Sequence, residues 1–495
     1  MLYWDSLLKP KRIRETSSVV RTVSDNRSPF KKDFDTICNS TVLRRLQDKA
    51  QVFPLEEEDY ARSRLTHSIE VLSIAESLGI QAREIVRKKE NRRYISKDSG
   101  GSVYRKVNKL IEDIPTILMG AALLHDMGNP PFGHLGEQII NDWFKDNLKH
   151  FEYSSVDHEF INCEISHSSL DRTLDPNYKN DLLHFDGNAQ LLRLITRLSL
   201  IVDDKGMNLS FPVIATIIKY PCSSSAINSG ILSRKKTGYF SSEEDTFNSI
   251  VNTLGLMNEG QCCRHPLVFL LEAADDIAYL TADIEDANHK GIISVSDIDE
   301  YLEVYGKDDR MVEKVRKAIL DYKQAAITMN YPNIDDYVMH RLRIYIKGQM
   351  INAMAQSFGK LYESIMNGTC EKELLEGSEA KTLTTCLREI ETDKIHYCSA
   401  IVENKTRAIV VMNKLLSMYV PAVLNYRREY DLGRDTEANL IYMSLSENYK
   451  FVCEKDIAAC ADNEIVYNKL RLVIDQISGM TDTRAMKVYR AISAT

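Results

Sequence analysis

Apolar residues recur three and four positions apart along most of this chain, and that spacing is typical of amphipathic α-helices. The pattern predicts a helix over residues 65–78 whose apolar face carries Leu65, Ile69, Leu72 and Leu78. From Asp297 onward long amphipathic stretches continue to the end, with breaks at Tyr331-Pro332 and at Asn367-Gly368-Thr369. The pattern therefore predicts an all-α protein.

Two further helices are predicted from apolar runs that also contain polar side chains, whose burial costs free energy. Residues 115–125 begin with a proline in the first turn and stay apolar up to His125, which predicts a nearly buried helix. Residues 266–287 begin at Pro266 and close near His289, and they include Asp275 among apolar neighbours. Acids on so apolar a helix indicate a function, although an amphipathic surface helix is the simpler reading.

The segment 221–246 differs from the rest because it is Ser-rich, charged and poor in periodic apolar residues. We expect it to form a long loop or a short hairpin inserted into the helical core. Loops of this length inside a compact domain are usually functional or disordered.

Charge and composition narrow the class of protein. The 495 residues have a formal net charge of −8, which argues against a wholly basic nucleic-acid binder. Basic segments occur at residues 83–93 and at Lys235-Lys236, and we interpret both as solvated surface.

The chain is expected to be cytoplasmic and to make no contact with a membrane. Its N-terminus lacks the apolar stretch of a signal peptide, and no apolar run approaches the roughly 18 residues that a membrane helix needs. The ten cysteines are scattered without a CxxC pair, which favours reduced thiols.

The segment AALLHDMGNPPFGHLGE, residues 121–137, holds the strongest chemical signal. His125 and Asp126 end the apolar helix, a Gly-Asn-Pro-Pro turn follows, and His134 and Glu137 come next. A buried His-Asp doublet is costly to desolvate, and coordination of a metal removes that cost. The doublet supplies half a coordination sphere, so further ligands must come from other helices.

His67 and Asp275 are the candidates for the missing ligands. Together with His125 and Asp126 they form a set of two nitrogens and two oxygens, drawn from three predicted helices. Such a set suits Mn²⁺, Fe²⁺, Co²⁺, Ni²⁺ or Zn²⁺ and, less comfortably, Mg²⁺. A histidine or aspartate of this kind, taken alone, is more often an ordinary core or surface residue. The prediction of a metal site therefore depends on the occurrence of all four residues together. Asp276 adjoins Asp275, and the phase of the helix favours Asp275 as the metal ligand.

The order of these ligands resembles that of the HD-domain phosphohydrolases and, among them, the deoxyguanosine triphosphate triphosphohydrolases. Five blocks carry the resemblance, and they span residues 40–290: LRRLQDKAQVFPL running into SRLTHSIEV, HDMGNPPFGHLGE, FDGNAQLLRL, IKYP with KKTGYFSSE, and EAADDIAYLTADIEDA. One departure is Asp186, where glutamate is usual before Gly187-Asn188. The C-terminal helices match in length and helicity alone.

The resemblance implies an HD-domain core over residues 1–295, with the insertion at about 221–246. It implies that residues 296–495 form a helical C-terminal region that completes the pocket and supplies oligomer contacts. By analogy with the family we expect a homo-oligomer, a hexamer or a tetramer, with single-stranded DNA as a possible regulator.

The implied reaction converts dGTP into deoxyguanosine and tripolyphosphate. Water attacks the α-phosphorus, with a divalent metal such as Mn²⁺, Mg²⁺ or Co²⁺ as cofactor. His134 is the candidate general acid/base, because imidazole titrates near neutrality. Glu137 lies one helical turn further and is placed to orient it.

The resemblance also implies residues that bind the substrate. Arg64 and Lys219, with the neighbouring Tyr220, are expected at the phosphates. Gln51 is expected near the sugar or base, and Asn188 by the active site. Tyr279 and Asp283 follow Asp275 at helical spacing, so the ring is expected to exclude a 2′-hydroxyl and the carboxylate to bind the 3′-hydroxyl.

Two other functions remain open. One is an HD phosphohydrolase that acts on another nucleotide, such as a monophosphate, a cyclic nucleotide or an alarmone. The other is a nucleotide- or nucleic-acid-sensing module on the same fold, which would need a damaged ligand set.

Overall fold

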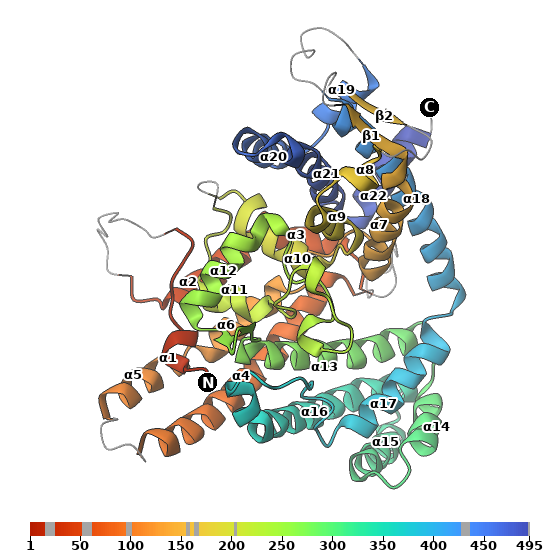
Figure 1. The fold of residues 1–495 in the computed structure, drawn as a ribbon. Coiled ribbons are helices and arrows are strands. Elements are labelled where there is room, and N and C mark those ends of the chain that lie inside the picture. Colours follow the sequence, from red (N-terminus) through yellow and green to blue (C-terminus); the bar gives the residue numbers. More distant parts are fainter. Residues whose placement is uncertain are drawn as a thin grey trace.

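The computed structural model describes residues 1–14, 25–51, 62–95, 101–154, 159–162, 168–201, 205–426 and 436–493. Helices dominate these residues, and the all-α prediction is confirmed (Figure 1). Residues 52–55, the end of the first sequence block, lie outside the described part of the chain.

The N-terminal part of the chain holds the helices that carry the sequence blocks. In order they are α1 (Trp4–Leu7), α2 (Pro29–Asn39), α3 (Thr41–Arg45), η1 (Leu46–Asp48), α4 (Arg64–Ile95), α5 (Gly101–Ile111), α6 (Ile114–Leu124), α7 (Gly133–Asn147), η2 (Leu148–His150), α8 (Leu170–Thr173), α9 (Pro176–Leu183), α10 (Gly187–Arg193), η3 (Leu194–Leu198), α11 (Phe211–Ile217), η4 (Ser224–Ala226), η5 (Leu232–Arg234), η6 (Ser241–Glu243), α12 (Glu244–Leu254) and α13 (Pro266–His289). Two antiparallel hairpins interrupt them: β1 (Phe151–Ser154) with β2 (Glu159–Asn162), and β3 (Met257–Asn258) with β4 (Gln261–Cys262).

In residues 295–426 and 436–493 the regular elements are all helices. They are α14 (Val295–Tyr305), α15 (Arg310–Thr328), α16 (Ile334–Met366), α17 (Lys381–Ile390), η7 (Glu391–Ile395), α18 (Ser399–Asn425), α19 (Glu437–Met443), α20 (Glu447–Ala459), α21 (Asp462–Ser478) and α22 (Asp482–Ser493). The breaks predicted at 331–332 and 367–369 are confirmed, because α16 lies between them.

The core is a layer of long helices that pack against one another. α4 packs on α6 and α13, and α13 packs in turn on α16, while α2 and α11 cover α6. α6 and α13 begin where they were predicted, each with a proline in its first turn. Nearly every side chain of α6 is buried, as the apolar run predicted. The start of α4, the end of α6 and the middle of α13 therefore meet inside the molecule.

The apolar face predicted for α4 is wrong at one position. Ile69 is 53% exposed, whereas Arg64 and His67 are buried together with Val71 and Ile74. The buried face of this helix thus begins with polar side chains. A prediction from hydrophobicity alone therefore placed Ile69 on the wrong face.

Residues 221–246 form an ordered loop. Three short 3₁₀ turns, η4 to η6, follow one another, and α12 begins at Glu244. The contact that closes the loop is a parallel bridge between Ser223 and Tyr239, so the hairpin alternative is wrong and the loop alternative is confirmed. A parallel bridge needs a long connection, which this segment supplies.

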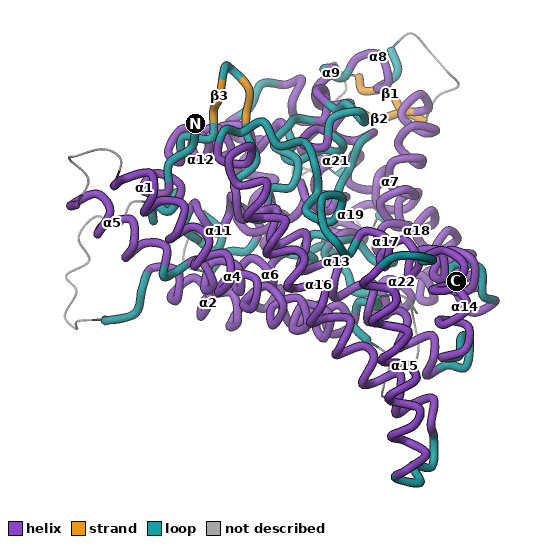
Figure 2. Tube along the Cα trace, turned by 90° about the horizontal axis from the view of Figure 1, so that it is seen from below, coloured by secondary structure: helices purple, strands orange, loops and turns teal. Residues whose placement is uncertain are grey.

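The C-terminal helices fall into two groups joined by α18. In Figure 1, α14 to α17 lie at the bottom, α19 to α22 at the top, and α18 runs between them along the right edge. α18 packs on α7, α19, α21 and α22. Seen from below, α15 projects from the body of the molecule (Figure 2).

Among the helices that the structure describes, one is long and apolar enough to cross a membrane by length and composition. It covers Ile401–Asn425 within α18, and 56% of its most apolar window is buried. The expectation that no segment reaches this length was therefore wrong. Its packing on four other helices is that of a core helix, which passes the same test.

Candidate active site

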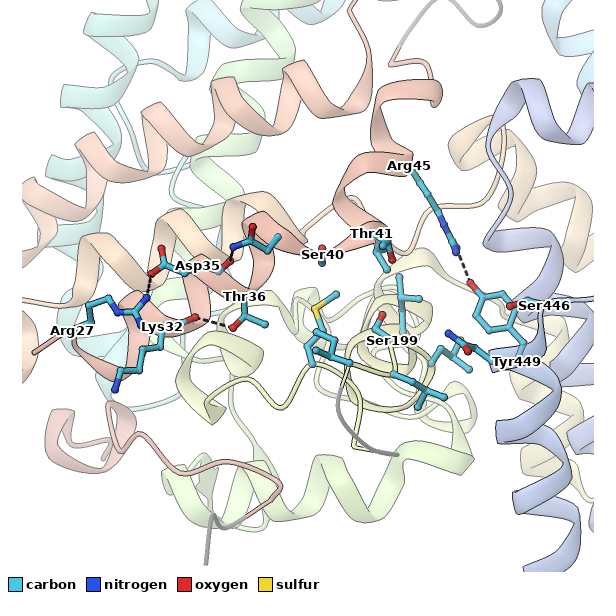
Figure 3. A pocket seen from close by; sticks show the side chains of 18 residues that line it. Arg27, Lys32, Asp35, Thr36, Ser40, Thr41, Arg45, Ser199, Ser446 and Tyr449 are labelled. Atoms are coloured by element: carbon cyan, nitrogen blue, oxygen red, sulfur yellow. Dashed lines mark hydrogen bonds and ion pairs between the residues drawn. The ribbon is translucent and has the colours of Figure 1, made fainter. Parts of the chain in front are cut away.

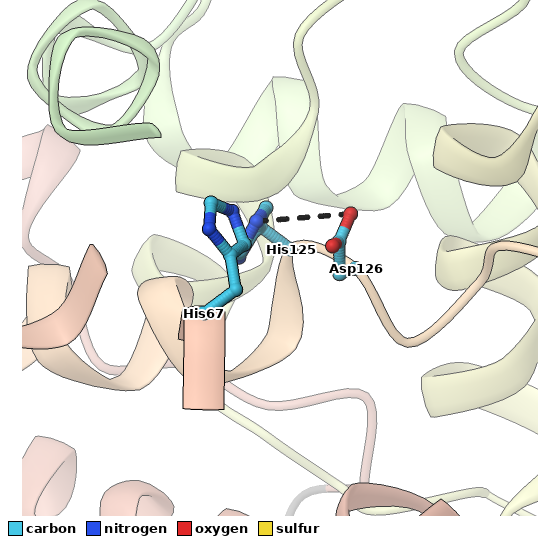
Figure 4. A group of neighbouring side chains, drawn as sticks. All are labelled: His67, His125 and Asp126. Carbon is cyan, nitrogen blue, oxygen red and sulfur yellow. Dashed lines mark ion pairs between the residues drawn. The ribbon is translucent and has the colours of Figure 1, made fainter. Parts of the chain in front are cut away.

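Three helices bring the predicted metal ligands to one point. His67 lies in the first turn of α4, His125 and Asp126 follow the end of α6, and Asp275 lies within α13. Asp275 Oδ1 lies 3.1 Å from His67 Nε2 and 3.4 Å from His125 Nε2, and Asp126 Oδ1 lies 3.7 Å from His125 Nε2. Figure 4 shows the side chains of His67, His125 and Asp126 pointing toward one another.

The donor set fits a divalent cation. His125 Nδ1 donates to the carbonyl of Ala122 at 2.7 Å, which leaves the lone pair of Nε2 directed into the cluster. Among the described residues, His125 Nε2 is buried without a hydrogen-bond partner. Ligand atoms of His67, His125 and Asp126 lie within 4.8 Å of one another. A cation at the centre satisfies these atoms and offsets the two carboxylate charges.

Each carboxylate of the cluster is also paired with a cation on its far oxygen. Arg64 Nη1 lies 2.8 Å from Asp126 Oδ2, and Lys219 Nζ lies 3.2 Å from Asp275 Oδ2. Burial opposes ionisation of both acids, but these cations and the histidines hold the pKa of each well below its usual value. Both acids therefore stay ionised and available as ligands at neutral pH.

The choice between the adjacent aspartates of α13 follows from their surroundings. Burial and the neighbouring charge of Asp275 raise the pKa of Asp276 to about 7, and Arg388 opposes that rise from 3.5 Å. The Oδ1 atom of Asp275 faces the two imidazoles, as the helix phase predicted.

His134 and Glu137 form a pair in the first turns of α7. His134 Nδ1 lies 3.0 Å from Glu137 Oε2, and the backbone N–H of Gly187 donates to Glu137 Oε1 at 2.9 Å. Burial opposes ionisation of Glu137, but its bonds to His134 and Gly187 and the charge of Lys236 hold its pKa below the usual value. The His134 side chain is 77% exposed, so its imidazole is open to solvent.

A cavity of about 530 Å³ lies over this cluster. Several predicted residues line it: Gln51, Arg64, Asp126, His134, Asp275 and Tyr279. Asp276, the alternative to Asp275 in the sequence interpretation, also lines it, and the interpretation missed three polar lining residues, namely His396, Tyr397 and Lys405. His396 and Tyr397 lie between η7 and α18, and Lys405 lies in the second turn of α18. This part of the chain contains no motif, so no local signal marked them.

The remaining predicted residues lie close to the cavity. They are not among the described residues that line it. Asp283 is buried behind Tyr279, with which it shares a hydrogen bond. Asn188 donates to Asp186 at the start of α10, and Tyr220 adjoins Lys219. Lys236, interpreted as surface, lies 3.3 Å from Asp186 and 3.8 Å from Glu137.

A second cavity, of about 640 Å³, lies between α2, η3 and α20 (Figure 3). In Figure 3, Arg27 and Lys32 lie at one end of it and Arg45 lies at the other, and its apolar lining includes Leu194, Leu198 and Met207. Among the residues that the structure describes, the two cavities share none. The cluster of metal ligands belongs to the first.

A His, His-Asp and Asp cluster on three core helices, in an all-α fold, defines a metal-dependent phosphohydrolase of the HD-domain class. The chain matches the HD domain over residues 64–184 and the phosphohydrolase-associated domain over residues 440–491.

Full-length relatives define the family. A deoxyguanosinetriphosphate triphosphohydrolase-like protein of Listeria monocytogenes is 36% identical over 490 residues, which is 99% of each chain. The deoxyguanosinetriphosphate triphosphohydrolase of Salmonella typhi is 31% identical over 493 residues, covering 94% of this chain and 93% of that one. The chain belongs to the deoxyguanosinetriphosphate triphosphohydrolase family, and it is a hydrolase.

Proposed function

We propose that the protein hydrolyses deoxynucleoside triphosphates, dGTP in preference, to the deoxynucleoside and tripolyphosphate. The observation that carries the proposal is that Asp126, Asp275 and His134 line one cavity together with Arg64. A metal cluster, a general acid/base and a phosphate-binding cation thus face the same space. The names of the relatives support dGTP as the substrate.

His67, His125, Asp126 and Asp275 hold the metal, for which Mn²⁺, Mg²⁺ and Co²⁺ are the candidates. When bound, the ion supplies Lewis-acid stabilisation of the charge that develops on the phosphate oxygens. Arg64 and Lys219 already pair with the ligand carboxylates, so their remaining N–H groups are free to bind phosphate oxygens.

His134 takes the proton of the attacking water. The oxygen of that water bonds to the α-phosphorus, the bond to the 5′-oxygen breaks, and that oxygen leaves with a proton to give the deoxynucleoside. Glu137 stabilises the imidazolium through the 3.0 Å contact with Nδ1 and keeps the ring oriented. The Gly187 N–H holds Glu137 in place from the other side.

The deoxyribose is held by Tyr279, Gln51 and groups around them. The ring of Tyr279 lines the cavity one helical turn after Asp275, where a 2′-hydroxyl meets it. Gln51 Oε1 is buried without a hydrogen-bond partner among the described residues, so it is ready to accept from a sugar or base. Asp283, one helical turn after Tyr279, binds the 3′-hydroxyl in this proposal, and Asn188 and Tyr220 are assigned to substrate binding by analogy with the family.

In this proposal residues 1–295 form the catalytic core. Residues 296–495 complete the pocket and supply the contacts of a homo-oligomer, a hexamer or a tetramer. The protein works in the cytoplasm, with single-stranded DNA as a candidate regulator.

Incubation of the metal-loaded protein with each of the four dNTPs and with GTP tests the proposal. We expect deoxyguanosine and tripolyphosphate from dGTP, at a rate well above that on GTP. Release of orthophosphate or pyrophosphate instead contradicts the reaction and favours hydrolysis of another nucleotide. Turnover of none of them, with metal bound, favours a sensing module.

A further inference from the structure

A seam of polar contacts joins the phosphohydrolase-associated domain to the segment before the catalytic helix α4. Arg45 Nη1 donates to Tyr449 Oη at 2.8 Å and to the carbonyl of Gly479 at 3.2 Å, and Figure 3 shows the first of these bonds. The buried Lys49 Nζ donates to the carbonyls of Ser478 and Asn129. The seam therefore reaches the Gly-Asn-Pro-Pro turn that follows Asp126.

Asp482 is the first residue of α22. It makes the two contacts of this seam that lie nearest to the proposed catalytic residues. Its Oδ1 accepts from the backbone N–H of Phe132 at 2.9 Å, and its Oδ2 accepts from the N–H of Ala50 at 2.9 Å. Phe132 lies two residues before His134, and Ala50 directly precedes Gln51. One carboxylate, 3% exposed, thus bridges the two loops that carry these cavity residues.

The conformation of the first loop needs such support. Phe132 has φ +62°, in the left-handed region that a bulky side chain rarely adopts. A residue held there persists when surrounding contacts over-determine its backbone. The bond from its N–H to Asp482 is a contact of that kind, and it is charge-assisted.

Local helix capping does not account for this carboxylate. Thr481 Oγ1 accepts from the Arg484 N–H at 3.2 Å and so satisfies a free donor at the start of α22. Both oxygens of Asp482 are committed to other segments, which lie 350 and 432 positions away in the chain. Burial of a carboxylate is costly and raises the pKa of Asp482 above its usual value, and two amide donors together with Lys49 and Arg64 offset part of that cost.

We propose that Asp482 is a positioning residue of the hydrolase, which holds His134 and Gln51 in their working arrangement through the backbone of Phe132 and Ala50. The phosphohydrolase-associated domain then sets the geometry of a site whose ligands it does not contribute. This inference depends on the roles of His134 and Gln51 in the proposed function. A shift of about 1 Å in a reacting group costs on the order of 100-fold in rate.

The test is the variant Asp482→Asn, which replaces one acceptor oxygen by a donor and so leaves one of the two N–H groups without its partner. We expect kcat on dGTP to fall by about 10-fold or more while metal content and KM stay within about twofold, the pattern of lost transition-state alignment. Hydrogen exchange at the Phe132 or Ala50 amide should become faster. Asp482→Glu keeps two acceptors and should recover part of kcat.

Thr483→Ala is the matched control. Thr483 is the next residue of α22 and also bonds the N-terminal segment, but its hydroxyl donates to the Asp48 side chain, whereas the Phe132 and Ala50 amides donate to Asp482. We expect kcat and exchange at the two amides to stay at the level of the unmodified protein. Equal losses in Thr483→Ala and Asp482→Asn would mean that the seam stabilises the fold without positioning the site.

Three outcomes overturn the inference. They are a normal kcat in a folded Asp482→Asn protein, loss of metal in parallel with kcat, and rapid exchange of the Phe132 and Ala50 amides in the unmodified protein. The last needs no variant, so it decides even if Asp482→Asn does not fold. If the unmodified protein hydrolyses no dNTP, the proposed function fails, and kcat on bis(p-nitrophenyl) phosphate replaces the dGTP measurement.

Discussion

The floor and the outer wall of the catalytic cavity are built in different ways. The floor consists of Asp126, Asp275 and Arg64, which lie in compact motifs at the end of α6, within α13 and at the start of α4. The wall contains His396, Tyr397 and Lys405, from a segment without a motif, and Tyr397 is 76% exposed. Buried, mutually paired groups hold charge in fixed positions, as chemistry requires. Exposed side chains at the rim contact a substrate without ordering the reaction, so we expect the floor to govern kcat and the wall to govern KM.

The largest effect should follow removal of a metal ligand from the floor. Asp126→Ala should lose bound metal and lower activity by more than about 100-fold, since even residues that only support metal ligands cost 10- to 100-fold. Metal content by elemental analysis and turnover of dGTP check this together. An Asp126→Ala protein with full metal and normal turnover removes the ligand assignment.

Removal of the acid/base should separate chemistry from binding. His134→Ala should keep its metal and its KM while kcat falls by roughly 100-fold, a typical contribution of a positioned proton-transfer group. Steady-state kinetics with a metal assay measure this. A raised KM with unchanged kcat shows instead that His134 binds substrate.

Tyr279 stands between floor and wall, and its loss should act on selectivity. Tyr279→Ala should raise the GTP to dGTP ratio of kcat/KM by about 10-fold or more, because the space for a 2′-hydroxyl opens. It should also lower the rate on dGTP, because the sugar is held less firmly. If Tyr279→Ala discriminates between GTP and dGTP as well as the unmodified protein does, another residue excludes the 2′-hydroxyl, and Gln51 is the next one to test. Equal rates of the unmodified protein on GTP and dGTP contradict a steric role.

The smallest effect should come from the wall. Lys405 lines the cavity from α18, so Lys405→Ala should raise KM for dGTP by about 5-fold, or roughly 1 kcal/mol, and leave kcat within about twofold. Lys414→Ala, an exposed lysine of the same helix outside the cavity lining, is the control and should change neither. A large loss of kcat in Lys405→Ala would erase the distinction between floor and wall.

Local sequence patterns were sufficient to predict many residues of the candidate site. They failed where polar side chains point into the protein. The order His67, His125-Asp126, Asp275 could be read from the sequence because each candidate ligand lies in a recognisable block, on a strongly periodic helix or directly after one. Ile69 was assigned to the wrong face of α4, because the ligands themselves occupy the inward turn. Lys236 was interpreted as surface, and its approach to Asp186 depends on how the loop 221–246 folds back.

The amino-acid sequence by itself determined the helical class, the starts of α6 and α13 and the identity of the candidate ligands, since these depend on spacing within a few turns. The tertiary structure decided which distant segments complete the site. Asp482 meets Ala50 across 432 positions, and no periodicity or motif encodes a contact at that separation. Such a contact forms because the helices pack in one arrangement, and that arrangement brings buried donors and acceptors together.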